Sequence, residues 1–273
     1  MMEQYQRCED STSTMPDPRP SRATLLACLL LLGCATTDAS TGANARNGPV
    51  QVHGALRSMM HAGETGTTVT LDELLPNPIL YAVGALTDLA GEITIIDGKA
   101  YLSFPDDGTD HGRTEVSPRS NAAATLLVTA EVPAWRHMVT ASPIPFEDIG
   151  DAIAGLAAEA GLDPESRFVF LVRGEVEDLD WHVIDGSRLA DGSATHEDHL
   201  AASIRGRLPR ASATLVGFHS TRDQGIFTHM DATTHIHCVL HEPLASGHVD
   251  HVTIPAGTTI AFPSRGNTRP DRD

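Results

Sequence analysis

The sequence predicts a β-rich fold of the α/β or α+β class with abundant mixed sheet. Short apolar runs separated by turn residues continue from about Val50 to Phe262. Between these positions, one long segment has its apolar residues at helical spacing. The chain has no repeat of fixed period, so each element has to be identified from its own residues.

The first strands are expected at Leu80–Leu86, Glu92–Ile96, Lys99–Phe104 and Ala123–Val132. Asp97-Gly98 stands between the second and third of these runs. Both of its residues tolerate positive φ, so this dipeptide predicts a tight hairpin. These strands therefore predict a sheet in the first half of the chain.

Helical patterns occur at three places. The long one covers Pro145 to Gly161, with acidic residues in its first turn and a glycine at its end. A second helix is expected at about His196–Arg205. Thr70-Leu-Asp-Glu73 has the spacing of a capping box, and Pro76 ends the short helix that it opens.

The last third of the chain predicts mostly strands. Phe168 to Ile184 is rich in Val, Phe and Leu and is expected to form two strands around Gly174. Ala213–Phe218 is a further strand. Beyond Ile226 we expect strands joined by turns at Pro243–Gly247 and Pro255–Gly257.

The composition limits what the chain binds. Of its 273 residues, 36 are acidic and 19 are basic, which gives a formal net charge of -17. A surface that negative repels phosphate backbones, so nucleic acid is not an expected partner. Hydrophobic residues make up 41% of the chain and aromatic residues 4%, so aliphatic side chains must build the core.

The N-terminal segment is typical of a bacterial lipoprotein signal. Arg19 and Arg22 precede the apolar run Ala23–Gly33, which is shorter than the roughly 20 residues that a membrane-spanning helix needs. The run ends in Leu-Leu-Gly followed by Cys34, the residue expected to carry the lipid. We therefore expect an exported lipoprotein that a lipid anchor holds at the periplasmic side of the outer membrane. Residues 1–34 would be the signal and 35–49 a flexible tether.

Half of the 14 histidines lie in one short stretch, at His219, His229, His235, His237, His241, His248 and His251. Residues two apart on a strand point to the same face, so His235 and His237 can bind one cation. Imidazole is a ligand of zinc and of other transition metals. The turn after Glu242 would bring back His248 or His251 as a third ligand, and His229 is a further possibility. The hairpin alone does not choose among them.

Several segments together resemble the acetolactate decarboxylase family. They are Gly84-Ala-Leu-Thr-Asp-Leu-Ala-Gly-Glu-Ile-Thr-Ile-Ile-Asp-Gly98, Ala213-Thr-Leu-Val-Gly-Phe-His-Ser220, His235-Ile-His237 and Gly247-His-Val249. The resemblance spans roughly Val50 to Ile254. It implies a dimeric, two-domain zinc enzyme that converts 2-acetolactate, a small hydroxy-keto acid, to acetoin and carbon dioxide.

The resemblance also implies roles for individual residues. It makes His235, His237 and His248 the zinc ligands and Glu92 the catalytic carboxyl group. It implies a mixed α/β domain at 50–165, a β-barrel-like metal-binding domain at 166–263 and a tail at 264–273.

Two positions depart from the family. His182 stands where the family has an active-site arginine, and the chain has no glutamate after Glu242 to match a C-terminal family glutamate. Histidine is positively charged only when it is protonated, whereas arginine always is. Two alternatives stay open. One is a cupin-like metal enzyme, in which Glu242 would be a ligand. The other is a lipoprotein that binds metal or a small acid without catalysis.

Overall fold

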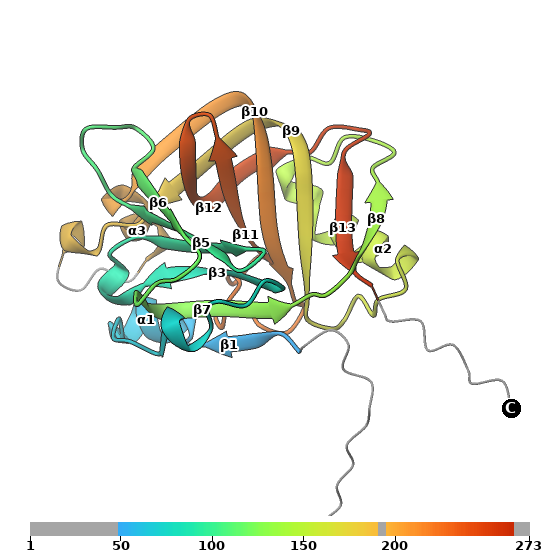
Figure 1. Ribbon diagram of the computed structural model, residues 1–273. Helices are drawn as coiled ribbons and strands as arrows, with labels where there is room; N and C mark the ends of the chain where they lie inside the picture. Colours follow the sequence, from blue (N-terminus) through green and yellow to red (C-terminus); the bar gives the residue numbers. More distant parts are fainter. Residues whose placement is uncertain (1–48, 191–194, 265–273) are drawn as a thin grey trace, which may run out of the picture. The chain divides into compact units, whose positions relative to one another are not determined.

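Two antiparallel sheets form the framework of the chain between residues 49 and 264 (Figure 1). The computed structural model describes residues 49–190 and 195–264, which all fall in the unit Ala43–Asp273. In this described part, all pairings between the named strands are antiparallel. The prediction of a β-rich α+β fold is confirmed. Of the two classes left open by the sequence, α+β is the one that these antiparallel sheets fit.

The first sheet, sheet A, contains the strands of the first half of the chain. Its order is β1-β7-β3-β4-β5-β6, and β2 also pairs with β7. The strands are β1 (Gln51–His53), β2 (Val69–Thr70), β3 (Leu80–Leu86), β4 (Glu92–Ile96), β5 (Lys99–Phe104), β6 (Arg113–Ser117) and β7 (Ala123–Glu131). Asp97 and Gly98 have φ of 51° and 68° between β4 and β5, so the predicted hairpin is confirmed.

The second sheet, sheet B, has the order β10-β11-β12-β9-β13-β8. Its strands are β8 (Trp135–Val139), β9 (Phe168–Val183), β10 (Ile204–His219), β11 (Thr234–His241), β12 (Leu244–Thr253) and β13 (Thr259–Pro263). Because β9 also pairs with β10, the four strands β9 to β12 close into a ring. This closure is the barrel-like part of the fold. Sheet B begins at residue 135, before the expected boundary at 165, and the division into two domains stays a prediction.

Two details of sheet B differ from the sequence prediction. Phe168–Val183 is one continuous strand, although Gly174 has a φ of 144° within it. Glycine adopts this conformation without strain, so it bends the strand without ending it. The turn between β11 and β12 consists of Glu242 and Pro243, and residues 244–247 already belong to β12.

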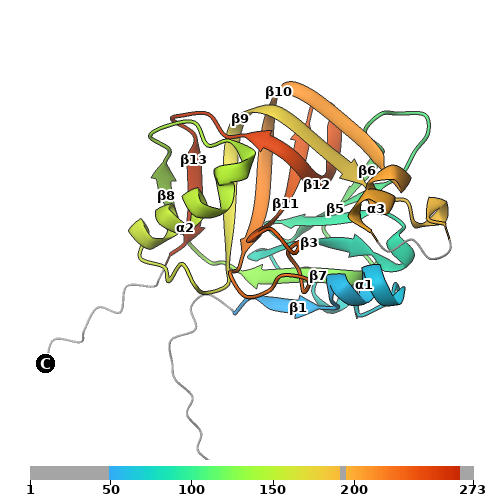
Figure 2. The same ribbon diagram turned by 180° about the vertical axis from the view of Figure 1, so that it is seen from behind.

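The helices are short, and α2 lies against one face of sheet B (Figures 1 and 2). They are α1 (Leu56–Ala62), η1 (Leu71–Glu73), η2 (Thr87–Leu89), η3 (Phe146–Asp148), α2 (Ile149–Glu159), η4 (Gly186–Arg188) and α3 (His196–Ala202). The long helix expected at 145–161 is thus a turn of η3 followed by α2. At η1 the Thr70 hydroxyl bonds the Glu73 side chain at 2.7 Å and caps no backbone N–H. Among the described residues, no helix is long and apolar enough to cross a membrane.

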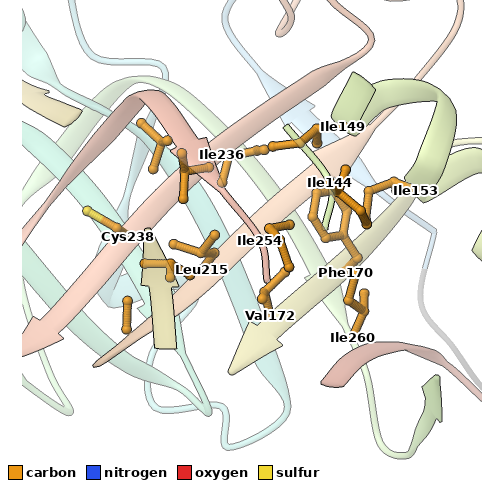
Figure 3. Packing of buried hydrophobic residues seen from close by; sticks show 14 of the residues in the cluster. Ile144, Ile149, Ile153, Phe170, Val172, Leu215, Ile236, Cys238, Ile254 and Ile260 are labelled. Carbon is orange, nitrogen blue, oxygen red and sulfur yellow. The ribbon is translucent and has the colours of Figure 1, made fainter. Parts of the chain in front are cut away.

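Sheet B has an apolar layer on each face. One face packs on α2, through residues that include Ile149, Ile153, Ile236 and Cys238 (Figure 3). The other face packs on sheet A, where Val239 meets residues such as Val83 and Val128. Successive residues of β11 therefore point alternately to α2 and to sheet A. His235 and His237 share the face of Val239, so their side chains lie between the two sheets.

Candidate metal centre

Three of the predicted residues come together at the β11–β12 hairpin. His235 and His237 are two apart on β11, and His248 of β12 lies directly opposite His237. One ring nitrogen from each residue lies within 4.8 Å of those of the other two. The two-residue turn sets this register, because it pairs His241 with Leu244 and all earlier partners follow. The structure therefore groups His248 with the pair.

The other histidines that the sequence left open lie outside this group. His251, also on β12, has its ring 5.5 Å from that of Phe146. The ring of His229 is 5.6 Å from that of His248, in a second layer around the site. Glu242 is exposed in the hairpin turn, which does not favour the cupin-like alternative. Cys34, the signal and residues 35–48 of the tether lie outside the described residues, as does the tail beyond Ser264.

Hydrogen bonds orient the two rings of β11. The Nδ1 of His235 is 2.7 Å from the Phe227 carbonyl oxygen, to which it must donate a proton. The Nδ1 of His237 is 3.0 Å from the Thr94 hydroxyl of β4. The two Nε2 atoms face each other at 3.2 Å. A ring that donates through Nδ1 keeps the Nε2 lone pair free, which is the arrangement found in metal-bound histidines.

The three rings are in the neutral form that binds metals. Burial lowers the pKa of His235 to about 3, and the charge of nearby His229 adds to this effect. Burial, followed by the charges of neighbouring histidines, also holds the pKa values of His237 and His248 well below the usual range. These imidazoles therefore offer lone pairs at neutral pH. Three such nitrogens fit a divalent transition metal, and the donor set suits zinc.

Glu92, at the start of β4, brings a carboxyl group to the same place. Its Oε2 lies 3.8 Å from His237 Nε2, and its Oε1 lies 3.9 Å from His182 Nε2. The backbone N–H of Ile184 donates to Oε1 at 3.3 Å. Burial raises the pKa of Glu92 to about 7, although the charge of His182 acts in the opposite direction. At neutral pH this carboxyl group can therefore both hold and release a proton.

His182 is the fifth residue predicted for the site. It lies on β9 directly opposite His248, and the two ring centres are 4.9 Å apart. Its Nδ1 is 2.7 Å from Asp250 Oδ1. Burial lowers the pKa of His182, but the hydrogen bond and charge of Asp250 outweigh it, so the net pKa is raised. At the position where we expected the family arginine to be replaced, the structure thus has a histidine that is hydrogen-bonded to an aspartate.

Two adjoining cavities lead to this group. The inner one, of about 50 Å³, is lined by Glu92, His182, His235 and His248 and by apolar side chains such as Leu56, Met59 and Phe227. The outer one is much larger, about 980 Å³. His196, His229 and His248 line both cavities. The two cavities therefore adjoin at these histidines, and His235 and His248 of the three grouped residues line the inner one.

Sequence reasoning missed several of these lining residues. Leu56, Met59 and Met60 belong to α1, which was not predicted because its seven residues are too few for a clear period. His196 and His199 of α3 lie outside the histidine-rich stretch. Their only signal in the sequence was the helix expected at this position. Tertiary packing brings them to the cavity, and spacing along the chain does not show that.

Two solved structures with a similar fold are acetolactate decarboxylases. No known protein family and no curated protein matches the sequence. The structure is similar to α-acetolactate decarboxylase from Bacillus subtilis strain 168, with a TM-score of 0.57 and 13% identity over 78% of this chain and 85% of that one. For acetolactate decarboxylase from Bacillus subtilis subspecies spizizenii the TM-score is 0.59, at 12% identity over 79% and 85% of the two chains.

A third similar structure is a Staphylococcus aureus protein of unknown function described as similar to α-acetolactate decarboxylase. Its TM-score is 0.55, at 17% identity over 78% of this chain and 84% of that chain. At these identities the likeness shows a shared fold. The fold and the three grouped histidines define a β-rich protein with an acetolactate-decarboxylase-like architecture and a candidate metal centre.

Proposed function

We propose that the chain is a zinc-dependent decarboxylase that converts 2-acetolactate, or a related 2-hydroxy-3-oxo acid, to acetoin and carbon dioxide. One observation carries this proposal. A buried carboxyl group with a pKa of about 7 lies within 4 Å of one of three convergent imidazoles, on the fold of known acetolactate decarboxylases.

The proposed reaction needs an electron sink and a proton. Loss of carbon dioxide leaves an electron pair on the carbon that carried the carboxylate, and one proton must reach the product for the reaction to balance. Zinc held by His235, His237 and His248 would leave coordination positions open to substrate oxygens and would act as a Lewis acid. Glu92 is our candidate proton donor, because burial raises its pKa to about 7 and its carboxyl group lies beside the three rings.

The surrounding residues support this role for Glu92. The inner cavity is walled largely by aliphatic side chains, which exclude bulk water and keep the carboxyl group protonated. The Ile184 N–H and His182 flank the same oxygen, Oε1, and Oε2 is the oxygen nearer to His237. We also assign His182 a catalytic role, because its ring lies next to both Glu92 and His248.

The test is turnover of racemic 2-acetolactate by the purified, zinc-loaded full-length chain, followed by acetoin colour and carbon dioxide release. We expect acetoin from the wild type. Exchange of both His235 and His237 for alanine should abolish zinc binding and turnover together. His241→Ala is the matched control, because it removes an exposed histidine from the same strand.

Elemental analysis of the same preparations measures the bound metal. Zinc in stoichiometric amount without acetoin above the buffer level would contradict the proposal. That result would favour a lipoprotein that binds metal or a small acid and has lost catalysis along with the arginine and the C-terminal glutamate of the family.

The location of the protein belongs to the same proposal. We propose export as a lipoprotein anchored through Cys34 on the periplasmic side of the outer membrane, and assembly into a homodimer. Metabolic labelling with a fatty acid, lost in Cys34→Ser, tests the anchor. Light scattering of the purified protein tests the dimer.

A further inference from the structure

Four directly opposed residues form a row across sheet B. Arg205 of β10 pairs with His182 of β9, His182 with His248 of β12, and His248 with His237 of β11. Directly opposed residues in antiparallel strands point to the same face, with Cβ atoms about 5 Å apart. Arg205 therefore ends the row that begins at the candidate metal ligands.

Arg205 differs from the other arginines of its strand. Arg207 lies opposite Asp180, and its Nε is 3.0 Å from the Asp180 carboxylate. Arg210 lies opposite Glu177 and forms an ion pair with it. At Arg205 the opposed residue is an imidazole, and Arg205 makes no ion pair with any carboxylate in the described part of the chain.

The guanidinium of Arg205 borders the space through which a ligand must come. Arg205 lines the outer cavity, together with His196, His229 and His248. Burial is the main cause that lowers the pKa of His196, and the positive charge of Arg205 adds to it, so the two groups are within electrostatic reach. Arg205 is thus, with Arg57 of α1, one of the two arginines that line this cavity, and it is the one in the row of His182 and His248.

Neighbouring carboxylates do not remove this positive charge. Asp250 lines the same cavity, but its Oδ1 is already bonded to His182. The other acids of the cavity, Glu147, Asp151 and Asp231, come from η3, α2 and the loop before β11. An anion that approaches a chain of formal net charge -17 needs a local cation to hold it.

We propose that Arg205 is the anion-binding group of this site and that it receives the carboxylate of a small 2-hydroxy acid. This inference rests on the proposed function, because it names the residue that orients the substrate of that reaction. Guanidinium and carboxylate match in shape and form two parallel hydrogen bonds. The reacting carbon would then be directed towards the three imidazoles, with its acid group turned to the outer cavity.

Binding of an unreactive probe tests the inference without turnover. The probe is 2-hydroxy-2-methylpropanoate, which has the hydroxyl and carboxylate groups but lacks the ketone needed for decarboxylation. Acetoin, which lacks the carboxylate, is the neutral reference. Calorimetric titration of the zinc-loaded full-length chain gives both dissociation constants.

We expect Arg205→Ala to weaken binding of the probe about tenfold, because a charge-assisted pair is lost. Binding of acetoin should not change. Arg205→Lys should keep part of the affinity, and Arg207→Ala, which removes a paired arginine of the same strand, should leave both ligands unaffected. Added salt should weaken binding of the probe to the wild type more than binding to Arg205→Ala.

Three results would overturn the inference. In the first, the wild type does not bind the probe. In the second, Arg205→Ala binds the probe as tightly as the wild type does. In the third, Arg205→Ala loses as much affinity for acetoin as for the probe. The proposed function fails separately, when 2-acetolactate is not turned over. Probe binding that depends on Arg205 in a chain without turnover would keep the anion site and reject the decarboxylase.

Discussion

The two faces of strand β11 carry different kinds of residue. On one face the strand places Ile236, Cys238 and Leu240 in the apolar cluster formed with β9, β10, β12 and α2, of which Figure 3 labels Ile236 and Cys238. Towards sheet A it places His235, His237 and the apolar Val239. A single alternating strand thus supplies packing on one side and ligand nitrogens on the other. Stability and function are therefore separable by residue, although they share eight consecutive positions.

The largest effect on the functional face is expected from Glu92→Gln. An amide cannot deliver the proton, so turnover of 2-acetolactate should fall by about 10² to 10⁴. Zinc content should stay at the wild-type level, because Glu92 is not one of the three grouped ligands. Steady-state kinetics and elemental analysis measure the two quantities. Glu115→Gln, at an exposed glutamate of β6, is the control and should leave both unchanged. Unaltered turnover in Glu92→Gln would remove Glu92 from the proposed reaction.

The packing face should respond in the opposite way. Leu240 is 1% exposed in this apolar cluster, opposite Ala213 and Ala245, so Leu240→Ala removes buried methyl groups and leaves a cavity. We expect the free energy of unfolding to fall by about 2–5 kcal/mol, measured with denaturant. Zinc stoichiometry of the folded variant should be retained. Val139→Ala, at a side chain that is 61% exposed, should change the stability by less than about 0.5 kcal/mol. A loss of zinc from folded Leu240→Ala would show that the two faces are not separable.

The buried carboxyl group of Glu92 should make the free energy of unfolding depend on pH. Burial raises the pKa of Glu92 from 4.5 to about 7, so the folded chain holds this proton more tightly than the unfolded chain does. Its contribution to stability is present below pH 4.5 and is lost as the pH rises to about 7. At full size this loss is about 3 kcal/mol, since each pKa unit corresponds to about 1.4 kcal/mol.

Comparison with Glu92→Gln isolates this contribution. The metal-free wild type should lose stability relative to Glu92→Gln between about pH 5 and pH 7. The buried histidines act with the opposite sign, since their lowered pKa values favour the folded chain above about pH 6.5. Taking the difference between the two proteins cancels most of that histidine contribution. Denaturant unfolding of both proteins between pH 5 and pH 7 measures this difference in stability. Parallel plots of the free energy of unfolding against pH would show that Glu92 is not desolvated.

Local patterns predicted strands β3, β4, β5 and β7 of sheet A and the place of the histidine pair, but not the short strands β1, β2 and β6. The Asp97-Gly98 hairpin is encoded by two residues that accept positive φ, and such signals are readable one segment at a time. The full length of β9 was missed, because Gly174 marks a bend as readily as an end. The hairpin pattern left His248 and His251 open, since only the turn at Glu242 and Pro243 sets the register. Arg205 was not singled out, because its place opposite His182, rather than opposite an acidic residue, depends on the pairing of β10 with β9.

The smallest expected effect is on zinc affinity. It tests whether Thr94 of sheet A helps to orient His237 of β11. The Thr94 hydroxyl of β4 lies 3.0 Å from His237 Nδ1 and accepts a hydrogen bond from Ser246 at 2.9 Å. Thr94→Val keeps the shape but removes the group that orients the ring, so zinc affinity should fall about tenfold. Competition with a chelator of known affinity measures this change.

The matched control is Thr125→Val, at a buried threonine of β7 whose hydroxyl donates to the Glu64 carbonyl oxygen. Both variants lose a buried hydrogen bond, so both should lose some stability. Only Thr94→Val should bind zinc more weakly. Equal zinc affinities in the two variants would mean that the Thr94 hydroxyl is not needed to orient His237. The other contact of this ring with sheet A, its hydrogen bond to the backbone of Ile93, would then be sufficient.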